Sequence, residues 1–233
     1  MPVNTLIVFD MDGVIAEESE AFSLAPFYDG IHAIVAKHMP DLALDDAFRQ
    51  ICYDAYVEHG CCLKSLWAPK LGMTLDWVLE SYRWINVEHL LPAVTTALQP
   101  KPSQVEKAIH LASLPHVTTV CLSQGHSDYV TGLLAHMGWL GPVIRPRDVH
   151  DIVSVGGHLK RTEEPYIYIR RCYPDYARYV MIEDTSLNLP PAKRQNFETH
   201  FCGMKMVHRD AFPFIDFHHL DTDRVLDHLI ANI

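Results

Sequence analysis

The feature that most constrains this sequence is a short apolar run that ends in two closely spaced carboxylates. Leu6 to Phe9 is entirely apolar, and Asp10-Met11-Asp12-Gly13 follows at once. Buried parallel strands read as such runs, and open α/β sheets bind ligands beyond the carboxyl ends of their strands. We therefore expect Thr5–Phe9 to form a central strand that presents both acids at a ligand-binding edge.

An EF-hand calcium loop also begins with Asp-x-Asp, but this sequence does not fit that loop. The EF-hand places glycine at its sixth position and glutamate at its twelfth. Here glycine is the fourth residue, and Phe22 and Ser23 lie near the far end of the corresponding segment. A surface turn that carries two acids without a function stays open as the simplest alternative.

Composition narrows the classes of function. The 233 residues have a formal net charge of −10, and 48% of them are apolar. Because no Lys/Arg-rich run offsets this charge, we expect no binding to nucleic-acid polymers, and an anionic ligand needs a metal or local donors.

The six cysteines form no Cys-x-x-Cys pair, which favours free thiols in a reducing compartment. With no visible signal peptide and no apolar run of transmembrane length, we expect a cytoplasmic protein without membrane association. Its oligomeric state is left open.

The order of the expected elements indicates an α/β core with a helical insertion. Apolar residues recur at helical spacing in residues 22–38, 47–57 and 75–91. Further strands are expected at 117–122 and 179–182, and helices at 103–113, 128–137, 165–172, 187–196 and 221–231. This alternation predicts a doubly wound (Rossmann-like) parallel sheet. Residues 1–16 and 100–233 would form the core domain, and residues 17–99 a helical cap domain inserted after the first strand.

Local signals refine the ends of these elements. Asp45 and Thr74 precede helical runs and are expected to be N-caps, and Ser103-Gln104-Val105-Glu106 has the pattern of a capping box. Val143-Ile144 is expected to form a short strand, and residues 199–202 and 204–207 are expected to be edge strands.

Polar groups follow three of the expected strands, and their convergence is more specific than any one of them. Asp10 and Asp12 follow the first strand, Ser123 the second, and Glu183-Asp184 the third. Four carboxylates at one edge of a sheet repel each other unless a cation lies among them. Oxygen ligands favour Mg²⁺, and the Ser123 hydroxyl, the backbone amides of Gln124 and Gly125 and a lysine could then hold phosphate oxygens.

On these residues the sequence resembles the haloacid dehalogenase-like (HAD) superfamily. Asp10-x-Asp12, Ser123 and Glu183-Asp184 match its first, second and fourth motifs in order. The helical insertion lies where this superfamily carries a C1 cap. Lys160 lies in the region of the third motif, although the proline that often follows that lysine is absent. If Lys160 does not serve, Arg161 or Lys193 would have to balance the phosphate charge.

The resemblance implies a Mg²⁺-dependent phosphatase that acts on a small phosphorylated metabolite. Asp10 would be the nucleophile that becomes an aspartyl-phosphate, and Asp12 would protonate the leaving group and then activate water. The implied metal ligands are Asp10, the backbone carbonyl of Asp12, Asp184 and, directly or through water, Glu183. The implied phosphoryl-binding residues are Ser123, Gln124, Gly125 and Lys160. An acid at position 12 argues against a dehalogenase, because that branch usually lacks one there.

Residues 47–66 and 84–92 resemble the cap of pyrimidine 5′-nucleotidases, which implies a nucleoside 5′-monophosphate as the substrate. Tyr56 and His59 would then lie near the ligand, unless they only pack or cap helices within the cap. The sequence departs from that branch at Gly13-Val14, where Asn-Thr is usual, and at Glu183, where aspartate is usual. A sugar-phosphate phosphatase, a phosphomutase and a catalytically silent binding protein therefore stay open as alternatives.

Fifteen histidines raise the question of a zinc site. His218-His219 lacks a helical His-x-x-x-His spacing, so the pattern favours scattered surface histidines.

Overall fold

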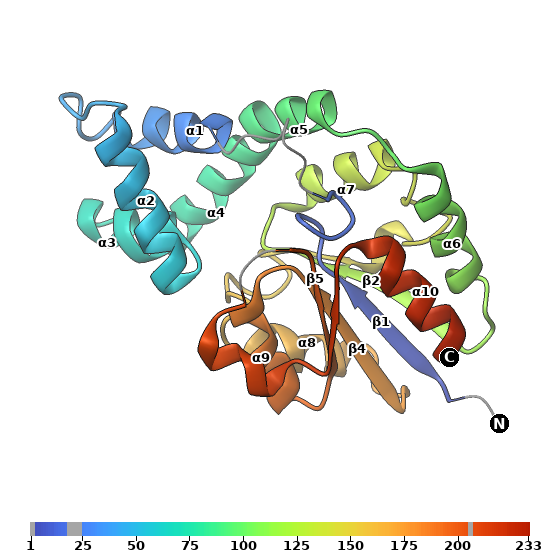
Figure 1. Ribbon diagram of the computed structural model, residues 1–233. Helices are drawn as coiled ribbons and strands as arrows, with labels where there is room; N and C mark the ends of the chain where they lie inside the picture. Colours follow the sequence, from blue (N-terminus) through green and yellow to red (C-terminus); the bar gives the residue numbers. More distant parts are fainter. Residues whose placement is uncertain (1–2, 18–24, 205–206) are drawn as a thin grey trace.

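The computed structural model describes residues 3–17, 25–204 and 207–233. Its strands form one sheet in which every neighbouring pair is parallel, in the order β3-β2-β1-β4-β5-β6 (Figure 1). The strands are β1 (Thr5–Phe9), β2 (Val117–Leu122), β3 (Val149–His150), β4 (Arg178–Glu183), β5 (Glu198–Cys202) and β6 (Phe217–His219). This order is that of a doubly wound Rossmann-type sheet, as the sequence predicts.

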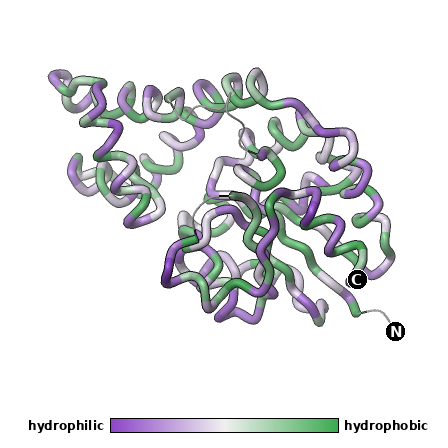
Figure 2. The backbone as a smooth tube through the Cα atoms, in the orientation of Figure 1, coloured by the Kyte–Doolittle hydropathy of each residue, from purple (hydrophilic) through white to green (hydrophobic). Residues whose placement is uncertain are grey.

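Helices cover both faces of the sheet, because its central strands are apolar on both sides. One face carries α6 (Pro102–Ala112), α7 (Ser127–His136) and α10 (Thr222–Asn232), and the other carries α8 (Glu164–Cys172) and α9 (Leu189–Arg194). Ile7 and Phe9 of β1 pack on the first face, whereas Leu6 and Val8 pack on the second. This two-sided packing explains why β1 is fully buried, and Figure 2 shows mainly apolar residues in the central strands.

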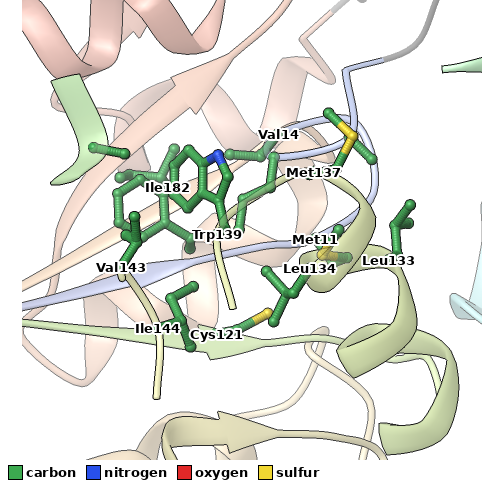
Figure 3. Close-up of a cluster of buried hydrophobic side chains, with 14 of the residues drawn as sticks. Met11, Val14, Cys121, Leu133, Leu134, Met137, Trp139, Val143, Ile144 and Ile182 are labelled. Carbon is green, nitrogen blue, oxygen red and sulfur yellow. The ribbon is translucent and has the colours of Figure 1, made fainter. Parts of the chain in front are cut away.

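Trp139 fills the core on the α7 side of the sheet. It is fully buried, and its ring meets that of Phe9 edge-on, with ring centroids 5.2 Å apart. Figure 3 shows Trp139 among side chains from β1, β2, α7 and β4, including Cys121, Leu134 and Ile182. The packing therefore joins the strand that precedes Asp10 to its neighbours on both sides.

The helical insertion forms a body beside the carboxyl ends of the strands (Figure 1). It contains α1 (Ala25–Val35), α2 (Asp46–His59), α3 (Ala68–Leu71), α4 (Leu75–Trp84) and α5 (Leu91–Ala97), with π-helical turns at Leu63–Trp67 and Ile85–Leu90. Phe48, Trp67 and Ile85 belong to its own buried cluster, which also takes in Ile152 and Leu159 from the core. Val94 of α5 packs into the core cluster instead. The limits of 17–99 for the cap stay a prediction.

The expected helix ends are partly confirmed. Asp45 Oδ1 accepts the Phe48 N–H at 2.9 Å, and Thr74 Oγ1 accepts the Trp77 N–H at 3.4 Å, so both residues are N-caps. The capping box at Ser103 is wrong. Helix α6 begins at Pro102, and its N-cap residue Lys101 makes no side-chain capping hydrogen bond. Proline suits the first helical position because its fixed φ is helical and it has no N–H to satisfy.

Two of the weaker strand predictions need correction, and a third falls partly outside the described residues. Ile144 makes only an isolated bridge to Leu140, and the short strand beside β2 is β3 instead. Residues 199–202 belong to β5, which is interior because β6 pairs outside it. The segment 204–207 lies partly outside the described residues, as does the start of the expected helix 22–38. In the described part of the chain, no helix has the length and apolarity that a membrane span requires.

Replacement of Trp139 tests this packing. We expect Trp139→Ala to lower the free energy of unfolding by about 3–5 kcal/mol, because it leaves a large cavity beside β1. Trp139→Phe is the matched control. Within the described residues Nε1 has no hydrogen-bond partner, so phenylalanine removes an unsatisfied donor and should cost much less. Urea unfolding of both variants measures the difference, and equal losses would contradict this account of the core.

Candidate active site

Strand register brings the predicted acids together. Phe9 of β1 pairs with Cys121 of β2 and with Ile182 of β4. The next backbone N–H, that of Asp10, donates to the Ile182 carbonyl at 3.0 Å. Asp10 therefore leaves the sheet beside Glu183, and Ser123 follows β2 at the same edge.

Lys160 lies between two of these acids. Its Nζ is 2.6 Å from Asp10 Oδ2 and 2.6 Å from Glu183 Oε2, and all three side chains are buried. Burial alone would lower the pKa of Lys160, but the two carboxylates raise it well above its usual range. The structure thus brings Lys160, rather than Lys193, to the acids: Lys193 pairs with Asp216 at 2.5 Å.

Asp10, Glu183 and Asp184 form a buried group of three carboxylates. Each offers an oxygen, and these oxygens lie within 4.8 Å of one another. Burial raises the pKa of Asp10, and burial together with Asp10 raises the pKa of Glu183 to about 7. When all three carboxylates are ionised, one lysine leaves an excess of negative charge. An oxygen-only donor set with excess negative charge fits a hard divalent cation such as Mg²⁺.

Glu183 is already engaged through both oxygens. Oε2 accepts from Lys160, and Oε1 accepts the Thr185 N–H at 3.0 Å. Asp10 Oδ1 accepts the Met11 N–H at 2.7 Å. These contacts orient Glu183 toward the lysine, which suits contact with a metal through water rather than direct ligation.

Gly13 makes room for Asp184. Its φ is +78°, and a Cβ added there would lie 2.0 Å from Asp184 Oδ2. Any side chain at this position would displace the carboxylate, and the positive φ would strain most residues as well. The glycine is therefore part of the site, a role that the sequence alone did not reveal.

Asp12 stands apart from the group of three. Its carboxylate is exposed, and Oδ1 accepts a hydrogen bond from the hydroxyl of Tyr129, a fully buried residue of α7. Burial and the nearby Asp12 raise the pKa of Tyr129 well above its usual range, so the phenol stays a donor. The sequence did not reveal the role of Tyr129, because nothing in the local pattern of α7 distinguishes it from a core residue.

The loop after β2 joins the acid site to the cap. Ser123 is buried, and its Oγ accepts the Gly125 N–H at 3.0 Å. The Gln124 side chain accepts the Lys160 N–H at 2.9 Å and donates to the Gly60 carbonyl of the cap at 3.2 Å. Gln124 therefore links the end of α2 to the backbone that carries the lysine.

Two further core residues, His126 and Arg161, hydrogen-bond to the cap. The His126 N–H donates to Asn86 Oδ1, on a π-helical turn of the cap, at 2.9 Å. Arg161 Nη1 donates to the Val57 carbonyl of α2 at 2.5 Å, and its guanidinium carbon lies 6.0 Å from the centre of the Tyr56 ring. Neighbouring residues 160 and 161 thus contact the acids and the cap respectively.

Only one of the two predicted cap residues faces the acids. Tyr56 is 38% exposed as a residue, but desolvation of its hydroxyl, together with the Asp184 carboxylate, raises its pKa. His59 is exposed, and its Nε2 lies 3.5 Å from Glu58 of the same helix. The structure therefore orients Tyr56 toward the acids and gives His59 a surface position.

The pKa of Glu183 predicts how metal-free protein responds to pH. With a pKa of about 7, Glu183 of the folded state keeps its proton up to about pH 7, whereas an unperturbed glutamate loses its proton near 4.5. The free energy of unfolding should therefore fall by up to about 3 kcal/mol as pH rises through this range. Mg²⁺ competes with the proton, so it should raise the melting temperature more at pH 8 than at pH 5. Calorimetry measures both shifts. Glu183→Gln should flatten the pH dependence, and an equal Mg²⁺ effect at both pH values would contradict the prediction.

Comparison with known proteins supports the fold. No protein-family model and no curated protein matches the sequence. A β-phosphoglucomutase from Clostridium difficile is 12% identical, with a TM-score of 0.60 over 99% of this chain and 96% of that one. An L-2-haloacid dehalogenase is 14% identical, with a TM-score of 0.59 over 98% of this chain and 100% of that one. A HAD-hydrolase from Bacillus subtilis bound to magnesium is 14% identical, with a TM-score of 0.59 over 100% of both chains. The chain therefore has the haloacid dehalogenase-like fold.

Proposed function

We propose that this chain is a HAD-superfamily phosphatase that hydrolyses a small phosphomonoester, with Mg²⁺, through a covalent intermediate on Asp10. The observation that carries the proposal is the Lys160 ammonium, 2.6 Å from both Asp10 and Glu183, beside Asp184. A mutase and a dehalogenase share the fold, so the proposal rests on the side chains of the site rather than on the fold.

The charges of the site suit a phosphate group better than an uncharged substrate. A carboxylate attacks phosphorus poorly, because both partners are negative. Lys160 offsets part of this charge at Asp10, and Mg²⁺ would supply the remaining charge compensation as a Lewis acid. Asp10, Asp184 and the backbone carbonyl of Asp12 would hold the ion, with Glu183 in contact through water.

The reaction that we infer has two displacements. In the first, an Asp10 oxygen forms a bond to phosphorus, the ester P–O bond breaks, and the leaving oxygen takes a proton from Asp12. In the second, the Asp12 carboxylate takes a proton from water as the water oxygen bonds to phosphorus. The bond between Asp10 and phosphorus then breaks, which releases inorganic phosphate. Tyr129 is a positioning residue, because its hydroxyl holds Asp12.

A nucleoside 5′-monophosphate is the substrate class that we propose first. The Tyr56 ring, with Arg161 behind it, offers an aromatic face near the acids on which a base could stack. Asp184 lies where a side chain at position 13 would be, so the asparagine that is usual in nucleotidases would collide with it. This collision weighs against a close relationship to nucleotidases. Hydrolysis of a panel of nucleotides and sugar phosphates decides between these substrates. A mutase would instead return an isomeric sugar phosphate, and a silent binding protein would release no phosphate with or without Mg²⁺.

Removal of the nucleophile tests the mechanism. Asp10→Asn should lower phosphate release from an active ester by at least about a thousandfold, because the amide is not a nucleophile. Release is measured colorimetrically, and circular dichroism checks that the variant is folded. Full activity in folded Asp10→Asn protein would refute the covalent mechanism.

Removal of the Tyr129 hydroxyl tests the position of Asp12. We expect Tyr129→Phe to lower kcat about tenfold or more, since a hydrogen bond to a charged group contributes about 1.5–3 kcal/mol. KM should change little, because the phenol does not touch substrate. Tyr176→Phe is a matched control, because its hydroxyl binds Thr118 at the other end of β2. Equal kcat values for both variants would show that Tyr129 has no catalytic influence.

A further inference from the structure

Three histidines from separate elements meet at the β6 edge of the sheet. His200 comes from β5, His219 from β6 and His228 from α10. Their ring centroids are 5.1, 5.3 and 5.2 Å apart for the pairs 200–219, 200–228 and 219–228. The expectation of scattered surface histidines is therefore wrong for these three. It failed because the cluster depends on the pairing of β5 with β6, which the sequence did not reveal.

The hydrogen bonds around His200 fix its tautomer. Its Nε2 lies 2.8 Å from Glu198 Oε1, and its Nδ1 lies 3.0 Å from His219 Nε2. Arg178 donates to both oxygens of Glu198, at 3.1 and 2.6 Å, so this carboxylate is paired with a cation and only accepts. His200 Nε2 therefore carries the proton, and its Nδ1 accepts the hydrogen bond from the His219 Nε2–H. A metal ion bound by these two nitrogens would replace that hydrogen, and neutral His219 would then carry its proton on Nδ1. A carboxylate that accepts from one ring nitrogen while the other nitrogen has a lone pair is the usual outer-shell arrangement of metal-binding histidines.

We propose that His200 Nδ1 and His219 Nε2, completed by His228, form a second metal site, for a borderline transition metal such as Zn²⁺. Two imidazole nitrogens bound to one tetrahedral Zn²⁺ lie about 3.3 Å apart, close to the 3.0 Å observed between His200 and His219. Three imidazoles around such an ion have ring centroids about 5 Å apart, as these rings do. The nitrogen ligands and the absence of shared residues separate this site from the oxygen site at Asp10.

His228 has to turn to complete the site. Among the described residues, only the acid group has three candidate ligand atoms within 4.8 Å of one another, so the nitrogens of the three histidines do not yet converge. The His228 ring stands at 63–70° to the other two and is only partly buried. A rotation of this side chain on α10 would direct a nitrogen between them. The Phe217 ring, 4.4 Å from that of His228, forms an apolar wall.

The surroundings keep the histidines neutral, as metal ligands must be. Burial lowers the pKa of His200, and burial together with His200 and His228 lowers the pKa of His219 to about 4. The charged or titratable groups that act on the pair are Glu198 and Arg178 from β5 and β4, His218 from β6, His228 from α10, and Asp221. A bound ion would tie β6, a three-residue edge strand, to β5 and α10. Binding should therefore also raise the melting temperature.

Zn²⁺ titration of metal-stripped, tag-free protein in excess Mg²⁺ tests the proposal. We expect one Zn²⁺ per chain by calorimetry, and Co²⁺ in its place should give the intense visible absorption of a tetrahedral site. His219→Ala and His228→Ala should each weaken binding by at least about a hundredfold, and Glu198→Gln by about ten- to a hundredfold. His218→Ala is the matched control. Its ring is exposed and, among the described residues, hydrogen-bonds only to the Gly203 carbonyl, so this variant should bind Zn²⁺ as the wild type does.

Two outcomes would overturn the proposal. One is Zn²⁺ binding that does not depend on the histidines, because it survives in both His219→Ala and His228→Ala. Loss of Zn²⁺ binding in excess Mg²⁺ has the same meaning, since the ion would then occupy the acid site. The other is an equal loss in His218→Ala. If an alanine variant fails to fold, His228→Gln at the partly exposed position repeats the test. No readout depends on phosphatase activity, so the metal site and the proposed function stand or fall separately.

Discussion

The structure depends most on one buried ammonium among three buried carboxylates. Lys160 holds Asp10 and Glu183 at 2.6 Å, where unpaired acids would be too costly to bury. Parallel register alone brings the acids together, so the sheet creates the repulsion that the lysine then relieves. The compensation is incomplete, and the remaining negative charge makes this edge attractive to a divalent cation.

The same lysine connects the site to the cap. Gln124 accepts the Lys160 N–H and donates to Gly60 of the cap, and the next residue, Arg161, donates to Val57. The position of α2 and the backbone of the lysine are therefore mechanically linked. Tyr56 belongs to the same helix and lies near Asp184, so a change in the position of α2 would also change the surroundings of the acids.

Much of the fold could be predicted from the sequence because its signals are local. The apolar strands β1, β2 and β4 and the acids at their ends are continuous runs, and the doubly wound sheet follows from their alternation with helices. The short edge strands β3 and β6 have no such signal in their own sequences, because only their pairing with β2 and β5 makes them strands. Tyr129 and the histidine cluster were missed for the same reason, since both arise from contacts between distant segments. The need for glycine at position 13 likewise could not be predicted, because it arises from contact with the distant residue Asp184.

The most direct test of the account is to trap the covalent intermediate. Protein with Mg²⁺ and a turning-over phosphomonoester would be quenched in acid and digested, and its peptides examined by mass spectrometry. The account predicts one phosphoryl group on the peptide that contains Asp10, at the aspartate side chain, and none in Asp10→Asn protein. Turnover without a label on Asp10, or a label on another residue, would contradict it.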